Sequence, residues 1–180
     1  MSDNSQISTL LQKAWSQRGQ GLYKKAKVSV EEARVLCRES DLEHLGRVYH
    51  ILAQFESDHD QYEDALELLK TSQSFYQRSG NSNKIAHSTR HIADIQSLQG
   101  DLKAAKTNYT VALELYRSAP ITHSLDMANA LRGYACCLES LTEYKQAISA
   151  WKETRVHYKL AGVKAGVKEA GDRISSLSKL

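Results

Sequence analysis

The sequence predicts an all-α protein built as a stack of helix hairpins. At four places along the chain an alanine is followed twelve residues later by another alanine, and the pairs recur about every forty residues. The 180 residues include only one proline and nine glycines, so long stretches lack helix breakers. Two helices cross closely where both carry a small side chain, so these pairs indicate a repeat array. They are Ala14 and Ala26, Ala53 and Ala65, Ala93 and Ala105, and Ala135 and Ala147.

The helices follow from the alanine anchors, the turn signals and the apolar spacing. The first helices of the hairpins are expected over about 5–19, 42–57, 83–99 and 123–141, and the second helices over about 22–38, 61–79, 102–118 and 143–161. Each second helix carries a large apolar residue four positions after its alanine, which predicts an amphipathic helix. These residues are Val30, Leu69, Tyr109 and Trp151.

The tail of the chain predicts a capping helix over 163–178. Val167, Ala170, Ile174 and Leu177 recur in it at helical spacing and would cover the last apolar face. The whole chain, 1–180, is therefore expected to form a single domain with four repeats and this cap. The repeats are expected over 5–39, 42–79, 83–118 and 123–161.

The pattern resembles the tetratricopeptide repeat family over about residues 5–161. The likeness is clearest in the third repeat, where Ala93, the turn Gly100-Asp101-Leu102, Ala105, Tyr109 and Ala112 occupy the family's small, turn, alanine, aromatic and alanine positions. The family's closing proline is present only after the third repeat, as Pro120. The resemblance implies a right-handed α-solenoid and a non-enzymatic adaptor.

The repeats are longer than the usual family pattern. From the second alanine of one repeat to the first alanine of the next, the chain runs 27, 28 and then 30 residues, whereas the family pattern gives about 22. The long form is similar to repeats of kinesin-light-chain-like and bacterial peptide-sensing members. It predicts longer hairpin arms and does not by itself select a function.

In the family, partners bind the inner face that the first helices line, and the resemblance carries those positions to this chain. It implies a groove that binds a protein or peptide. The chaperone-binding members' carboxylate clamp is not matched, because its sites are occupied here by residues such as Leu11, Ile51 and His91. The groove positions are Trp15 in the first repeat; Arg47, His50 and Gln54 in the second; His87, Arg90 and Asp94 in the third; and Asn129, Arg132 and Glu139 in the fourth.

One groove position is cationic, or can become so, in three successive repeats. His50, Arg90 and Arg132 would form a ladder suited to carboxylates or an acidic peptide, in a mildly basic groove. The alternative is that they are ordinary solvated residues paired with Asp94 and Glu139. The sequence favours neither interpretation. For Trp15, packing on the second repeat is favoured over an anchoring role at the open end of the groove.

Composition and charge narrow the function classes. Twenty-four Lys and Arg against 21 Asp and Glu leave a net charge of +3, far from the clustered excess of a nucleic-acid binder. The start of the chain has no basic segment followed by an apolar one, and no apolar run has the length of a membrane span. Three cysteines without framework spacing fit a reducing compartment. We therefore expect a cytoplasmic protein that binds neither nucleic acid nor membrane.

No catalytic motif stands out, and a metal site is disfavoured. His87, His91 and Asp94 can share a helical face that His50 approaches, but polar helix faces often carry histidine without a metal. Cys136 and Cys137 are expected to be packing residues. The sequence thus predicts no enzyme activity, no cofactor and no metal. The alternative to an adaptor is a self-associating scaffold that works as a homo-oligomer.

Overall fold

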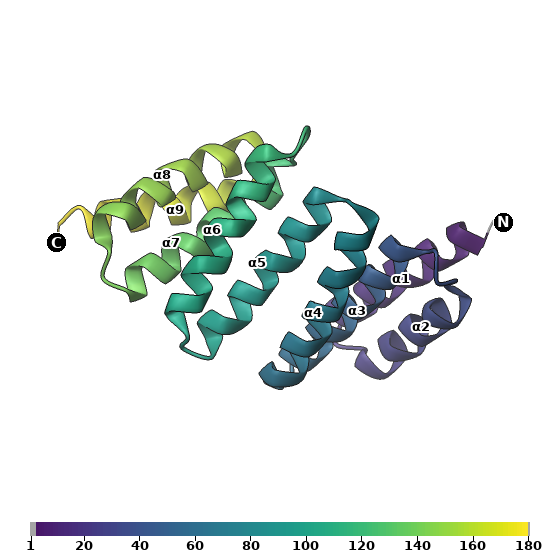
Figure 1. Ribbon diagram of the computed structural model, residues 1–180. Coiled ribbons are helices and arrows are strands. Elements are labelled where there is room, and N and C mark those ends of the chain that lie inside the picture. The colour runs from purple at the N-terminus through teal and green to yellow at the C-terminus, as the bar shows by residue number, and fades with distance from the viewer. Residues whose placement is uncertain (1–2, 180) are drawn as a thin grey trace. The chain divides into compact units, whose positions relative to one another are not determined.

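The structure is a computed structural model that describes residues 3–179, and these residues form nine helices (Figure 1). They divide into two compact units, Met1–Lys84 and Ile85–Leu180. The first unit contains two hairpins, and the second contains two hairpins followed by a single helix. The helices are α1 (Asp3–Gly19), α2 (Tyr23–Leu36), α3 (Leu42–Ser57), α4 (Tyr62–Ser79), α5 (Ser82–Leu98), α6 (Leu102–Ser118), α7 (Ser124–Ser140), α8 (Tyr144–Leu160) and α9 (Lys164–Leu177).

Each helix begins and ends within two residues of its predicted bounds, and local chemistry explains several of the ends. Gly80, Gly100 and Gly162 follow α4, α5 and α8 with positive φ angles of 72°, 82° and 74°. Glycine adopts this left-handed conformation without steric cost, so it ends a helix cleanly. At the start of α6, the Asp101 carboxylate accepts a hydrogen bond from the Ala104 backbone N–H at 3.1 Å.

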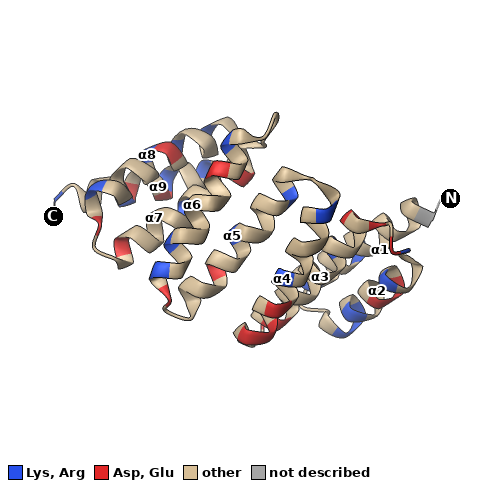
Figure 2. Cartoon of the chain, in the orientation of Figure 1, with Lys and Arg blue, Asp and Glu red and all other residues tan. Residues whose placement is uncertain are grey.

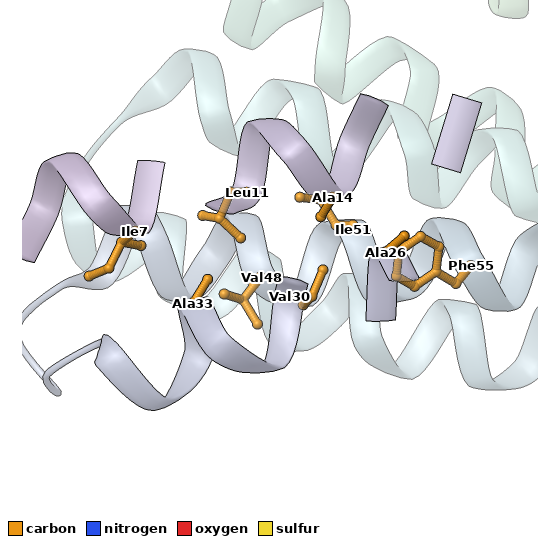
Figure 3. Packing of buried hydrophobic residues seen from close by; sticks show 9 residues of the cluster. All are labelled: Ile7, Leu11, Ala14, Ala26, Val30, Ala33, Val48, Ile51 and Phe55. Carbon is orange, nitrogen blue, oxygen red and sulfur yellow. The ribbon is translucent and has the colours of Figure 1, made fainter. Parts of the chain in front are cut away.

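The alanine pairs lie where the helices of each hairpin cross. All eight of these alanines are fully buried. In the first unit the surrounding core comes from three helices, because α3 covers the hairpin of α1 and α2 (Figure 3). The burial of both alanines in every repeat agrees with the predicted close approach of the two helices. The core residues in Figure 3 are Ile7, Leu11, Ala14, Ala26, Val30, Ala33, Val48, Ile51 and Phe55.

Tyrosine rings pack directly on helix glycines at three further places, which the sequence analysis did not foresee. A Cβ added at Gly46, Gly133 or Gly166 would lie 2.5–2.6 Å from a ring atom of a tyrosine. The absent side chain is therefore what lets these helices approach. The pairs are Gly46 of α3 with Tyr76 of α4, Gly133 of α7 with Tyr109 of α6, and Gly166 of α9 with Tyr158 of α8.

Ion pairs join successive hairpins within each unit, and most run in one direction. The cation lies on the earlier hairpin and the carboxylate on the helix or hairpin that follows. One pair, Arg173 of α9 with Glu139 of α7, runs the other way at 2.8 Å. The pairs in the common direction are Arg18 with Asp58 (2.6 Å), Lys27 with Glu56 (3.2 Å), Lys106 with Glu143 (2.6 Å), Arg117 with Glu153 (2.9 Å) and Arg132 with Glu169 (2.6 Å).

Two glycines of α9 allow a matched test of the packing. Gly166→Ala should lower the free energy of unfolding by about 1–3 kcal/mol, because its methyl group would overlap the Tyr158 ring. Gly171→Ala meets nothing within 4 Å and should raise stability by up to about 1 kcal/mol, since alanine is the better helix former. Thermal unfolding of both variants followed by circular dichroism measures the difference. Equal effects of the two substitutions would contradict the close approach of Tyr158.

Candidate functional site

The candidate site of the second unit is the face formed by α5, α7 and α9, and we call it the α5–α7–α9 face. The predicted groove residues of α5 are His87, Arg90 and Asp94, and those of α7 are Asn129, Arg132 and Glu139. The third helix, α9, adds two residues that the sequence analysis did not select, Glu169 and Arg173. Both make ion pairs with predicted residues of α7.

Asp94 is the centre of a network on α5. Its carboxylate accepts hydrogen bonds from the Tyr109 hydroxyl at 2.7 Å and from Arg90 Nη1 at 3.1 Å. Arg90 Nη2 also donates to Nε2 of His91, at 2.5 Å. A guanidinium can only donate, so this nitrogen of His91 is the acceptor and the ring proton lies on Nδ1, 3.3 Å from Asp94. The His91 ring, Arg90 and Asp94 thus hold one another in place.

Arg132 on α7 makes a forked ion pair with Glu169 on α9. Arg132 Nη2 and Nε lie 2.6 Å and 2.8 Å from the two carboxylate oxygens of Glu169. This hydrogen bonding lowers the pKa of the Glu169 carboxyl below its ordinary value and raises the pKa of Arg132. The side chains remain 46% and 36% exposed, so the pair is accessible to a partner as well as to water.

Aromatic residues of α8 donate hydrogen bonds to Glu139 and Asn129 of α7. The indole N–H of the fully buried Trp151 donates to Glu139 at 2.5 Å. The Tyr158 hydroxyl donates to the Asn129 side-chain oxygen at 2.9 Å. Like Asp94 with Tyr109, these polar groups are positioned by the second helix of their own hairpin, so their geometry is set before any partner arrives.

The charges of the α5–α7–α9 face are balanced. Arg90, Arg132 and Arg173 supply three cations, while Asp94, Glu139 and Glu169 supply three carboxylates. One of the two interpretations left open by the sequence paired the arginines with Asp94 and Glu139. Arg90 does pair with Asp94, but Arg132 pairs with Glu169, and Glu139 pairs with Arg173 instead. The tail helix therefore changes the electrostatics of this face.

In the first unit, the predicted residues divide into exposed and buried ones. Trp15 is 44% exposed, with the Arg18 guanidinium carbon 4.8 Å from its ring centroid. Arg18 also forms a forked pair with Asp58, at 2.6 Å and 2.7 Å. Arg47 is half-buried, while His50 and Gln54 are buried. The accessible feature of this unit is thus a tryptophan under a paired arginine, which suits contact with an apolar or aromatic group.

The contacts of His91 bear on the metal interpretation. The His87 and His91 rings meet edge to face with centroids 4.8 Å apart. A metal at His91 would have to displace either the Arg90 hydrogen bond on Nε2 or the Asp94 contact on Nδ1. A guanidinium at this distance also repels a cation. These contacts would compete with a metal ion for the nitrogens of His91.

The cysteine thiols are packing groups in this structure. Burial raises the pKa of Cys37, Cys136 and Cys137, and none of the three forms a disulfide with another described residue. Cys137 is fully buried and donates a weak hydrogen bond to the Leu102 carbonyl at 3.4 Å. A raised pKa opposes formation of the reactive thiolate.

The pKa of Glu169 gives a pH test of the site. A carboxyl whose pKa is lowered by folding stabilises the folded state above its unfolded pKa, and this contribution is lost as the pH falls through the folded value. Glu169→Gln should therefore lower the free energy of unfolding at pH 7 by less than about 1 kcal/mol, because the pair is solvent-exposed. The difference from the wild type should shrink below pH 4.5, the ordinary pKa of the group.

Urea unfolding of the wild type and of Glu169→Gln at several pH values between about 3 and 7 measures this effect. Glu114→Gln provides the control, because Glu114 is an exposed carboxylate on α6 of the same unit. If the free energy of unfolding of Glu169→Gln differs from that of the wild type by the same amount down to pH 3, the ion pair does not contribute to stability in solution.

Comparisons with known proteins place the fold. The family model described as tetratricopeptide repeat matches residues 44–118, which include nearly all of α3 and the whole of α4, α5 and α6. No curated protein matches the sequence. The match bears out the family resemblance predicted from the alanine pairs.

Solved structures agree over nearly the whole chain. The structure of BtubC (BKLC) from P. vanneervenii has a TM-score of 0.63 at 15% identity, covering 99% of this chain and 92% of its own. The structure of a putative kinesin light chain with nearly identical TPR-like repeats from Podosopora anserina has a TM-score of 0.66 at 13% identity, covering 99% and 97%. At these identities the likeness shows the fold, and the predicted all-helical repeat fold is confirmed.

Two statements about the class of protein follow. Tetratricopeptide repeats mediate contacts between proteins and are typically not enzymes, which agrees with the predicted class of function. In the part of the chain that the structure describes, every helix is too short or too polar to cross a bilayer.

Proposed function

We propose that this chain, which belongs to the tetratricopeptide repeat family, is a non-enzymatic adaptor that binds a segment of another protein along its first helices. The observation that carries the proposal is that aromatic side chains of the second helices hydrogen-bond to polar side chains of the α5–α7–α9 face and fix their positions. Tyr109 holds Asp94, Trp151 holds Glu139 and Tyr158 holds Asn129. Polar groups fixed in this way lose little freedom when a partner binds, so more of the interaction energy appears as affinity.

Of the two arginines predicted from the sequence, Arg132 is the one that a partner would reach; Arg173 of α9, at 48%, is equally accessible. The side chain of Arg132 is 46% exposed, whereas that of Arg90 is 13% exposed and engaged by both Asp94 and His91. A carboxylate of the partner would share Arg132 with Glu169 or displace Glu169 from it. Charge-assisted bonds of this kind are the strong ones, and the forked geometry makes them selective.

The balanced charge favours a partner segment that carries both signs over a purely acidic one. Each arginine of the α5–α7–α9 face lies beside a carboxylate, so a run of acidic residues would meet Asp94, Glu139 and Glu169 as well as the cations. An acidic residue opposite Arg132 and a polar or basic residue opposite Glu169 would match the face. Of the two interpretations left open by the sequence, we therefore keep the acidic partner only as a single acidic anchor within a segment of mixed charge.

The first unit offers a candidate contact surface of its own. Trp15, together with Arg18 above its ring, offers an aromatic contact, and Arg47 offers a half-buried cation. The buried His50 and Gln54 would act through packing. We propose Trp15 as the apolar anchor, because exposed tryptophan is enriched among residues that dominate binding energy.

Reversing one exposed arginine tests the proposal. A peptide-display library selected on the immobilised full-length chain should yield binders that contain an acidic residue. Arg132→Glu should weaken their binding at least about tenfold, because the variant places a carboxylate opposite the peptide's own. Fluorescence anisotropy of the selected peptides measures the affinity.

Arg117→Glu is the matched control. Arg117 is 50% exposed and, like Arg132, pairs with a glutamate of the following helices, but it lies on the second helix α6. Binding should survive this substitution. Selected peptides that lack acidic residues, or that lose binding equally to both variants, would overturn the assignment of the α5–α7–α9 face.

A further inference from the structure

The last hairpin and the tail helix expose an apolar groove edged with cations. The groove lies between α8 and α9, has a volume of about 700 Å³, and is lined in part by Val156 and Val167. Val156 is 55% exposed. Arg155, Lys159 and Lys164 complete its charged rim. Among the described residues, no carboxylate forms an ion pair with these three cations.

The first hairpin exposes a second apolar groove, edged with carboxylates. It lies between α1 and α2, has a volume of about 500 Å³, and is lined in part by Leu10, Val28 and Val35. Val28 and Val35 are 58% and 70% exposed. Glu31 and Glu32 are its charged lining residues, and Arg34 on the same helix engages Glu31 at 2.6 Å. Glu32 forms no ion pair with another described residue, so its carboxylate is available.

The two grooves match the way in which α6 and α8 already meet inside the second unit. There, Arg117 lies twelve residues after the alanine of its helix and pairs with Glu153, six residues after the alanine of the next second helix. Lys159 lies twelve residues after Ala147, and Glu32 lies six residues after Ala26. Lys159 therefore has the register of Arg117, and Glu32 has the register of Glu153.

The direction of charge is also the same. Inside the chain, the earlier hairpin usually supplies the cation and the following helices supply the carboxylate, as with Lys106 and Glu143. The groove of the last hairpin is lined by cations and that of the first hairpin by carboxylates, although α8 and α2 each carry charges of both signs (Figure 2). If the last hairpin of one copy packed against the first hairpin of another, the cation would again lie on the earlier hairpin and the carboxylate on the following one.

We propose that the chain associates head to tail with a second copy of itself, through the α8–α9 groove of one copy and the α1–α2 groove of the next. In this contact Lys159 faces Glu32, in the arrangement of Arg117 and Glu153. Val156 and Val167 of one copy cover Val28 and Val35 of the other, removing apolar surface from water. Because the two contacting surfaces differ, the contact is heterologous and can repeat into longer chains.

Sedimentation velocity of the full chain over a range of concentrations, roughly 10 μM to 1 mM, tests the proposal. We expect the average mass to rise with concentration and to fall with added salt. Glu32→Lys and Lys159→Glu should each weaken association at least about tenfold, because each places like charges opposite one another. Lys152→Glu, the same charge change at an exposed site of α8 outside the groove, should leave association unchanged.

Two combinations separate a specific contact from a general charge effect. A chain that carries both Glu32→Lys and Lys159→Glu rebuilds the pair in reverse and should regain association. An equimolar mixture of the two single variants should also regain association, with the two variants in alternation, because every contact between unlike variants pairs opposite charges and every contact between identical variants opposes like charges.

A neutral polar variant checks the groove independently of charge. Val35→Ser changes a largely exposed side chain, so the chain should fold, and association should weaken about tenfold because apolar contact area is lost without a change of charge. A wild type that stays monomeric over the whole range overturns the proposal, as would be the case if another protein normally covers these grooves. Equal effects of Lys152→Glu and Lys159→Glu, or no recovery in the double variant, would also overturn it.

Discussion

The close crossing of two helices at a pair of alanines is the constraint on which each repeat depends. A crossing helix pair can approach only as far as its largest facing side chains allow, and all eight alanines are fully buried. The crossing fixes the position and angle of the first helix relative to the second. It thereby decides which side chains of the first helix face a partner and which are reached by the tyrosines and the tryptophan of the second helix.

The crossing also explains why aromatic residues of the second helices can hydrogen-bond to the polar side chains of the first helices. Tyr109 and Trp151 each lie four residues after a crossing alanine, and each reaches past the crossing to a carboxylate on the first helix. Their rings fill the core while their polar edges bond to groups near the surface. Burial raises the pKa of Tyr109, so its hydroxyl stays protonated and remains a donor to Asp94 at neutral pH. Core packing and the polar face are therefore one arrangement.

The sequence was sufficient to predict the helices, because the alanine spacing and the glycine turns are local signals. It also placed Arg90 beside Asp94, since residues four apart share a helix face. It missed Glu169 and Arg173 because their role depends on where α9 packs, which no local pattern reveals. A signal was present: these two residues are themselves four apart and opposite in sign, which marks one face of the expected tail helix. The tyrosine contacts of Gly46 and Gly133 were missed for the same reason, since an isolated glycine in a helix does not reveal its neighbour.

The contribution of α9 goes beyond that of a cap. It approaches α8 through Gly166 and Tyr158, just as α7 approaches α6 through Gly133 and Tyr109, so α9 packs like the first helix of a further repeat. In that place it gives a carboxylate to Arg132 and a guanidinium to Glu139, which completes the charges of the α5–α7–α9 face. Its other side leaves the α8–α9 groove open, because no second helix of the described chain covers it. The helix α9 thus contributes to both proposals. One side of it completes the α5–α7–α9 face, and the other side lines the α8–α9 groove, on which another repeat can pack.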